Sequence, residues 1–269
     1  MKMQITVAAV LAVCAMAVQA QQAQPADQAA ELAKKLANPV ASLISVPLQY
    51  NYDENFGPDD KGSKSVLNIQ PVIPFSLDKD WNLITRTIIP LVDQQDIPVA
   101  GEDKSGMGDI LQSFFFSPKA PVGGWILAAG PVGLYPSATD EMLGGEKWGA
   151  GPTLLALQQR SGWTYGLLAN HVWSVAGDDG RADISATFLQ PFLSYITKTK
   201  TTLGVNTEST YDWEGGQWSV PVNASVAQLL KAGPQIMQLT LGARYWAESP
   251  DSGPEDWGGR VGITFLFPK

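Results

Sequence analysis

The chain has 269 residues, of which 45% are hydrophobic and 16% charged, and its formal net charge is −8. The excess of 26 Asp and Glu over 18 Lys and Arg argues against a nucleic-acid-binding protein, because such proteins present basic surfaces to phosphates. The length suffices for one membrane barrel or for one to two ordinary domains.

Residues 1–20 have the pattern of a secretory signal peptide. Lys2 is followed by an apolar segment at 5–18, and residues 18–20 offer a cleavage site with small side chains. The apolar segment is shorter than the roughly 20 residues that a membrane-spanning helix needs. Cys14, the single cysteine, lies within it, so the exported chain is expected to lack disulfides, thiol catalysis and cysteine metal sites. A lipoprotein signal at Cys14 is the less favoured alternative.

Residues 21–42 are expected to form a periplasmic lead-in with a short helix. Pro25 suits the start of a helix, an apolar stripe runs from Ala29 to Leu36, and Pro39 prevents the helix from continuing. Two interpretations remain open at this point: a simple lead-in, which we favour, or a plug that reaches into a pore.

Residues 43–269 alternate apolar and polar side chains over long runs, which indicates β-strands. In the segment 201–212, for example, Asn206, Glu208 and Thr210 share one face and an apolar row occupies the other. Twelve strands are expected, at residues 44–53, 65–76, 81–92, 108–117, 124–135, 147–158, 163–175, 184–196, 201–212, 217–229, 236–247 and 258–268.

The connections between these strands alternate between short and long, with 213–216 as the one short exception among the long ones. An even number of strands, short turns on one side and long loops on the other are typical of bacterial outer-membrane barrels. The sequence therefore predicts an all-β fold, an antiparallel up-and-down transmembrane β-barrel of about 12 strands with a short N-terminal helix. The short turns and both ends of the chain are placed in the periplasm.

Charged and aromatic residues follow the same division. Most acidic residues fall in or beside the long loops, where they are either solvated, which we favour, or a rim that binds divalent cations next to lipopolysaccharide. All nine tryptophans lie near expected strand ends, where they would form the interfacial girdles of a barrel. They are Trp81, Trp125, Trp148, Trp163, Trp173, Trp213, Trp218, Trp246 and Trp257.

Prolines inside the expected strands argue against this interpretation, because proline cannot donate a hydrogen bond to a neighbouring strand. β-Bulges accommodate some of these prolines, but they do not account for all six. The six positions are Pro71, Pro74, Pro131, Pro152, Pro191 and Pro221.

Ten polar side chains fall on the polar faces of the expected strands and are candidates for lining the lumen. They are Asn68, Gln70, Arg86, Asn170, Gln190, Asn206, Glu208, Asn223, Arg244 and Arg260. The four charged residues among them would be costly in lipid, so they are expected to face inward. They would either set the selectivity of a narrow polar pore or pair across the lumen and fill the barrel.

Several segments together resemble a bacterial outer-membrane family that is labelled as transporters. They are 67–75, 108–114, 147–152, 189–192 and 207–213, within a resemblance that covers nearly all of 38–269. Members of that family also carry the labels "meta-pathway of phenol degradation" or "neuromedin U". The resemblance implies a porin-like barrel and no particular substrate or functional residue.

Enzymatic activity is disfavoured. His171, the single histidine, and Ser174 are three positions apart on an expected strand and therefore face opposite sides, so they cannot form a base and nucleophile pair. No catalytic residue, metal site or cofactor is expected.

The favoured function is a passive porin-like channel for small molecules, with hydrophobic or aromatic solutes among the candidates. A non-conducting structural or adhesive barrel is the first alternative, and a lipid-modifying barrel enzyme is the second. A soluble periplasmic β-sandwich fits the alternating loop lengths poorly. Expected partners are outer-membrane lipid and lipopolysaccharide, the barrel-assembly machinery and a small-molecule solute, with no nucleic acid.

Overall fold

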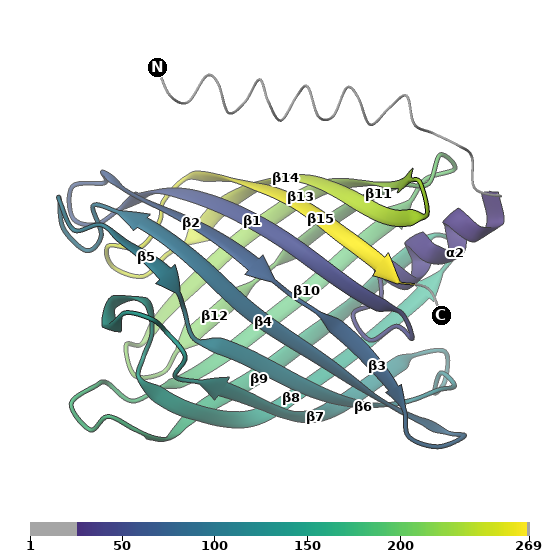
Figure 1. Ribbon diagram of the computed structural model, residues 1–269, viewed down its shortest axis with the longest axis horizontal. Helices are drawn as coiled ribbons and strands as arrows, with labels where there is room; N and C mark the ends of the chain where they lie inside the picture. The colour runs from purple at the N-terminus through teal and green to yellow at the C-terminus, as the bar shows by residue number, and fades with distance from the viewer. Residues whose placement is uncertain (1–25, 268–269) are drawn as a thin grey trace.

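Each strand pairs with antiparallel neighbours, and the last strand pairs with the first, so that the sheet closes on itself (Figure 1). The computed structural model describes residues 26–267, so the expected signal peptide lies outside the described residues. The strand segments are β1 (Ile44–Phe56), β2 (Gly62–Ile69), β3 (Val72–Ser76), β4 (Trp81–Gln95), β5 (Lys104–Met107), β6 (Ile110–Pro118), β7 (Ile126–Tyr135), β8 (Lys147–Arg160), β9 (Trp163–Gly177), β10 (Ser185–Ile196), β11 (Thr201–Thr207), β12 (Ser209–Asp212), β13 (Gln217–Ala232), β14 (Gln235–Glu248) and β15 (Trp257–Phe267).

The sheet is closed by the pairing of β1 with β15, which runs from Ile44 opposite Phe267 to Tyr52 opposite Gly259. The fifteen segments make twelve strands, because β2 and β3, β5 and β6, and β11 and β12 are each one interrupted strand. The predicted fold, a closed antiparallel barrel of twelve strands with one short helix, is confirmed. Closure leaves no sheet edge to pair with other chains.

Each of the three interruptions lies opposite a proline on the neighbouring strand. A residue at the interruption donates its backbone N–H to the proline carbonyl, but the proline has no N–H with which to complete the pair. One of the two ladder bonds is therefore missing, and the regular pairing stops for one or two residues. The donors and acceptors are Gln70 and Pro47 at 2.8 Å, Gly108 and Pro90 at 2.9 Å, and Glu208 and Pro221 at 3.2 Å.

Pro131 and Pro152 lie directly opposite each other on β7 and β8. Each is next to a gap in the ladder on its other side: β6 and β7 are unpaired around Pro131, and β8 and β9 are unpaired around Pro152. The preceding residues, Gly130 and Gly151, allow the neighbouring backbone to approach closely, because a Cβ at either position would collide with a carbonyl oxygen.

The other prolines that the sequence placed inside strands also coincide with places where no donor is needed. Pro71 lies in the interruption between β2 and β3 and accepts a hydrogen bond from the N–H of Thr87 at 3.1 Å. Pro74 pairs with β4 only, and Pro191 pairs with β9 beside a gap toward β11 and β12. All six prolines are thus compatible with the closed sheet.

The two ends of the barrel differ in their connections. The turn end carries the connections 77–80, 119–125, 161–162, 197–200 and 233–234, and the loop end carries 57–61, 96–103, 136–146, 178–184, 213–216 and 249–256. The two-residue turn Ser161-Gly162 has φ values of 51° and 84°, the left-handed pair that joins adjacent antiparallel strands tightly. Long loops and short turns therefore alternate as the sequence predicts.

Large apolar side chains are exposed on the outer face of the wall. Examples from β8, β9, β11 and β13 are Leu154 at 56%, Leu167 at 43%, Leu203 at 48% and Val226 at 41% relative exposure. Soluble proteins rarely present continuous apolar surface of this extent, whereas a wall in contact with lipid requires it.

Seven of the nine tryptophans are exposed on this outer face, as girdle residues would be: Trp81, Trp125, Trp148, Trp163, Trp173, Trp213 and Trp257. Trp218 stacks on Tyr211, with ring centroids 4.9 Å apart. The assignment of Trp246 to a girdle is wrong, because its indole N–H donates to Asp53 inside the barrel at 2.9 Å. Because the indole N–H of Trp246 binds a polar partner in the lumen, this ring faces away from the lipid side.

The helix α2 (Ala26–Leu36) lies at the turn end, together with both ends of the described chain (Figure 1). Ala33 is 1% exposed and packs with Ala41, Leu43, Leu229 and Leu266 of the linker and the barrel wall. The helix therefore lies across part of the turn-end mouth. Among residues 26–267, no helix is both long and apolar enough to cross a membrane.

Candidate solute pathway

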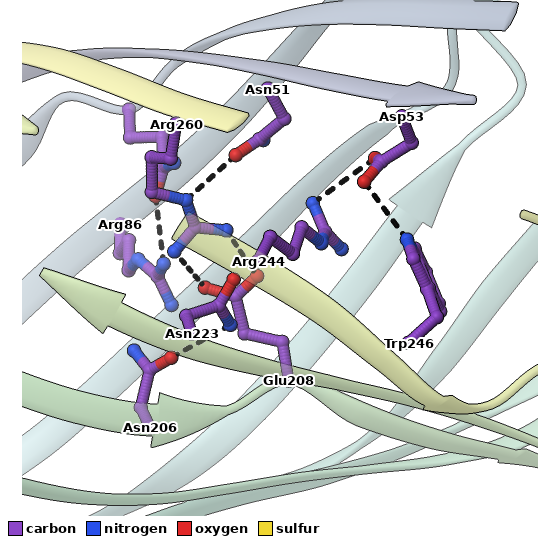
Figure 2. A network of polar contacts seen from close by, with 10 residues as sticks. Asn51, Asp53, Arg86, Asn206, Glu208, Asn223, Arg244, Trp246 and Arg260 are labelled. Atoms are coloured by element: carbon purple, nitrogen blue, oxygen red, sulfur yellow. Dashed lines mark hydrogen bonds and ion pairs between the residues drawn. The ribbon is translucent and has the colours of Figure 1, made fainter. Parts of the chain in front are cut away.

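Two ion pairs and one further arginine lie inside the barrel (Figure 2). Arg260 of β15 binds both carboxylate oxygens of Glu208, with N–O distances of 2.9 and 2.7 Å. Its Nε also donates to Asn51 on β1 at 2.7 Å. A bidentate pair of this kind is among the strongest polar contacts in proteins, and it fixes the position of both side chains. Glu208 lies at the interruption between β11 and β12.

The second ion pair joins Arg244 of β14 to Asp53 of β1, with Nη1 and Oδ2 3.4 Å apart. The guanidinium also lies 4.7 Å from the centre of the Trp246 ring, and that ring donates to the other oxygen of Asp53. Both charged side chains are largely buried, at 10% and 9% exposure. Mutual pairing and the indole contact offset the cost of removing these charges from water.

The third arginine, Arg86 of β4, has a neutral partner. Its Nη2 donates to Oε1 of Gln70 at 2.8 Å. Among the described residues, no carboxylate lies within ion-pair distance of it. The nearest acidic group of this network, Glu208, has both oxygens engaged by Arg260. The network thus holds three arginines and two carboxylates, and Arg86 is the arginine that forms no ion pair among the described residues; Lys64 of β2, opposite Asp53, is a further cation on this inner face.

The remaining predicted residues also lie inside the barrel. Asn223 donates to Oδ1 of Asn206 at 2.9 Å, one strand apart, and Asn223 is buried. Asn68, Asn170 and Gln190 line a cavity beside Arg86. The structure therefore brings the ten residues into one lumen, where six of them form direct pairs with one another: Glu208 with Arg260, Gln70 with Arg86, and Asn206 with Asn223. Arg244 pairs with Asp53 instead.

The loop-end cavity has a volume of about 310 Å³ and two chemically different walls. One wall is polar and includes Arg86, Gln70 and Asn68. The other is apolar and is formed by inward-facing side chains of β4, β6, β7, β9 and β10, namely Ile88, Leu111, Leu134, Val172 and Phe188. This asymmetry arises because the charged network is confined to β1, β4 and the strands from β11 to β15.

A second space, the turn-end cavity, has a volume of about 200 Å³ and is bordered by the linker after α2. The two cavities share four lining residues: Gln49, Gln70, Arg86 and Gln190. These polar side chains therefore lie between the two cavities. Each can form hydrogen bonds to water or to a passing polar solute.

The sequence did not single out Gln49, Asn51, Asp53 or Trp246, although all four face the lumen. The first three alternate with Tyr50 and Tyr52, which is the period-two signal of a polar inner face. Asp53 was grouped with the loops because the strand was expected to end there, whereas β1 continues to Phe56. Trp246 is two positions from Arg244 on the same strand, so the same period-two signal places it on the inner face.

His171 lies on the outer face and its Nδ1 is 2.7 Å from Oγ1 of Thr187. Thr187 also accepts a hydrogen bond from the indole N–H of Trp213 at 2.8 Å. Ser174 instead contacts Asp183 at 3.0 Å, so the expectation that His171 and Ser174 do not meet is correct. The histidine and threonine support a tryptophan at the loop end, and no carboxylate contacts this histidine among the described residues.

At the loop end, Lys147 binds Asp183 at 3.2 Å and Arg181 donates to the carbonyls of Glu141 and Gly144 at 2.7 Å. The hydrogen bond from Lys147, assisted by that from Ser174, holds the pKa of Asp183 below its usual value. These contacts connect the loops 136–146 and 178–184 to the rim of the barrel.

No protein-family model matches the sequence, and no curated protein matches it. The fold is similar to that of solved outer-membrane barrels. An outer membrane channel from Pseudomonas putida F1 has a TM-score of 0.66 at 14% identity, covering 84% of this chain and 96% of that one. The NanC porin has a TM-score of 0.50 at 10% identity, covering 83% and 100%. The N156A mutant of outer membrane phospholipase A from Escherichia coli has a TM-score of 0.50 at 12% identity, covering 87% and 98%. At such identities the similarity establishes the fold, which channels, porins and an enzyme share.

Proposed function

We propose that the protein is a passive, narrow channel for small molecules in the bacterial outer membrane. The observation that carries this proposal is the pair of lumen cavities that share the lining residues Gln49, Gln70, Arg86 and Gln190 inside an apolar outer wall. A purely structural barrel has no need for two neighbouring cavities lined by shared polar side chains. The exposed apolar wall supports placement in lipid, with lipopolysaccharide around the loop end and assembly by the barrel-assembly machinery.

The excess positive charge at Arg86 favours small anions over small cations between the two cavities. Coulomb attraction is strong where little water screens it, so one unmatched arginine in a narrow passage biases the ions that enter. The paired charges contribute less, because each arginine there is neutralised by a neighbouring carboxylate. Removal of Arg86 should therefore affect selectivity more directly than removal of a paired residue.

A non-conducting barrel is the rival function, and a specific observation favours it. The ion pairs project into the lumen, and α2 with its linker covers part of the turn end. In this alternative the network fills and stabilises the barrel, and the polar side chains conduct nothing.

Single-channel recording of the refolded mature protein in planar bilayers distinguishes the two. We expect small conductance steps with anion preference, a weaker preference in Arg86→Gln and a stronger one in Glu208→Ala, which leaves Arg260 unpaired. Lys79→Gln, at an exposed position of the turn end, removes one positive charge as a control and should leave the selectivity unchanged. A protein that shows heat-modifiable migration, and so is folded, yet never conducts would establish the non-conducting barrel.

A further inference from the structure

The loop-end cavity combines two features that seldom occur together in a water-filled pore. It holds the one lumen arginine without a carboxylate partner among the described residues, and an apolar wall faces that arginine across the cavity. A pore that passed only water and inorganic ions would gain nothing from Leu, Val and Phe side chains along its lining, because these interact poorly with hydrated ions. The wall therefore indicates a solute with an apolar part.

Arg86 is held in place for a ligand. Gln70 accepts from Nη2 and orients the guanidinium, while the other N–H donors form no hydrogen bond with a described side chain. A guanidinium binds a carboxylate through two parallel hydrogen bonds, with a geometry that matches the two oxygens. Glu208 lines the same cavity, but both its oxygens accept hydrogen bonds from Arg260 and it forms no ion pair with Arg86.

The remaining lining residues fit the body of such a ligand. Leu111, Leu134, Val172 and Phe188 supply an apolar surface, and the cavity volume of about 310 Å³ is at the lower end of the range for small-molecule sites. The space suits one short alkyl or ring-bearing chain. A second charged group on the ligand would face this wall unpaired, which disfavours dicarboxylates and zwitterions.

We infer that the loop-end cavity binds small, water-soluble monocarboxylates with an apolar body, the carboxylate on Arg86 and the body against the wall that includes Val172 and Phe188. The assignment of such a ligand as a permeating solute rests on the proposed channel function, whereas the binding site itself does not. Arg86 would then form its ion pair with the solute and not with a carboxylate of the protein.

Isothermal titration of the refolded protein in nanodiscs with sodium hexanoate tests the site directly. Hexanoate should bind more tightly than acetate, which lacks the apolar chain, and than hexylammonium, which has the opposite charge. Arg86→Gln should weaken hexanoate binding about tenfold or more, the magnitude of a lost charged hydrogen bond. Arg86→Lys should retain part of the affinity, and Lys79→Gln should retain all of it.

Val172→Thr probes the apolar wall without changing its shape. Replacing one methyl group by a hydroxyl should weaken hexanoate binding roughly fivefold and leave acetate binding unchanged. Equal affinities for hexanoate and acetate, or hexanoate affinity that Arg86→Gln does not alter in a folded protein, would overturn the inference.

Recording the same proteins in planar bilayers separates this inference from the channel proposal. Binding of hexanoate without conductance would support the carboxylate site and refute the channel. Conductance without hexanoate binding would support the channel and refute the site. Binding together with a hexanoate-dependent block of the chloride current that is lost in Arg86→Gln would support both.

Discussion

Asp53 has two partners at once, the guanidinium of Arg244 and the indole N–H of Trp246. The Nε atom of Arg244 is buried without a hydrogen bond. The carboxylate of Asp53 is therefore the main charged group in contact with Arg244. Asp53→Asn keeps an acceptor for the indole but removes the charge that faces Arg244. We expect a loss of about 2 kcal/mol in the free energy of unfolding, which is typical of a hydrogen bond to a charged group.

Urea unfolding of the refolded protein, followed by tryptophan fluorescence, measures this loss. Asp251→Asn, on the exposed loop 249–256, is the matched control and should change the free energy by less than about 0.5 kcal/mol. The double variant Asp53→Asn with Arg244→Met should lose less than the sum of the single variants, because no unpaired charge remains buried. Strictly additive losses would show that the two residues act independently.

Asp183 gives the loop end a dependence on pH. Its pKa is lowered in the folded protein by Lys147 and Ser174, so the carboxylate contributes stability above its ordinary pKa and loses it as the pH falls through the lowered value. Acidification into that range should release the loop 178–184 and increase its cleavage by an acid-active protease. Asp183→Asn should show the same cleavage at all pH values, and a variant that kept the pH dependence would contradict this assignment.

At the scale of single elements, the wall depends on glycines that precede prolines. A Cβ at Gly151 would collide with the carbonyl oxygen of His171 on β9, where Pro152 leaves the ladder open. Gly259, on the outer face of β15, has no atom within 4 Å of such a Cβ. Both lie in long strands of the same sheet, so they form a matched pair.

Gly151→Ala should therefore lower the free energy of unfolding by about 1–3 kcal/mol, the usual range for overpacking, while Gly259→Ala should be neutral. Heat-modifiable migration gives the folded fraction, and urea unfolding gives the free energy. Similar behaviour of the two variants would mean that the backbone at Gly151 moves apart without cost.

The elements themselves were largely predictable from sequence, and the pairing between them was not. Strand positions follow from a period of two and from turn residues, which are local signals. Rare charges inside strands pointed to Arg86, Glu208, Arg244 and Arg260 for a physical reason that holds without knowledge of register. Which of them meet depends on registers between distant strands, such as the contact of Asn51 with Arg260, 209 positions apart.

The prolines also show that the sequence alone does not reveal the register between strands. Taken singly, each proline weakens the interpretation of its segment as a strand. Only the register reveals that the missing donors coincide with gaps and interruptions, as at Pro131 and Pro152. Asp53 was overlooked because a strand end is the least determined part of a sequence-based prediction.

At the scale of the whole molecule, the turn-end cavity is bordered by the linker that follows α2, and the helix packs across part of that end of the barrel. Ala33 is the most buried described residue of the helix and faces Leu229 and Leu266 of the barrel wall.

Ala33→Glu would place a charge in this apolar contact, which is unfavourable without a partner, and should displace the helix. The channel conductance should then rise by about twofold or more, because displacement of the helix opens the turn-end cavity to solvent. Glu31→Gln, on the exposed face of the same helix, should leave it unchanged. An unchanged conductance in Ala33→Glu, with the helix displaced as judged by faster protease cleavage near residue 36, would mean that the passage beside Arg86 alone limits the current.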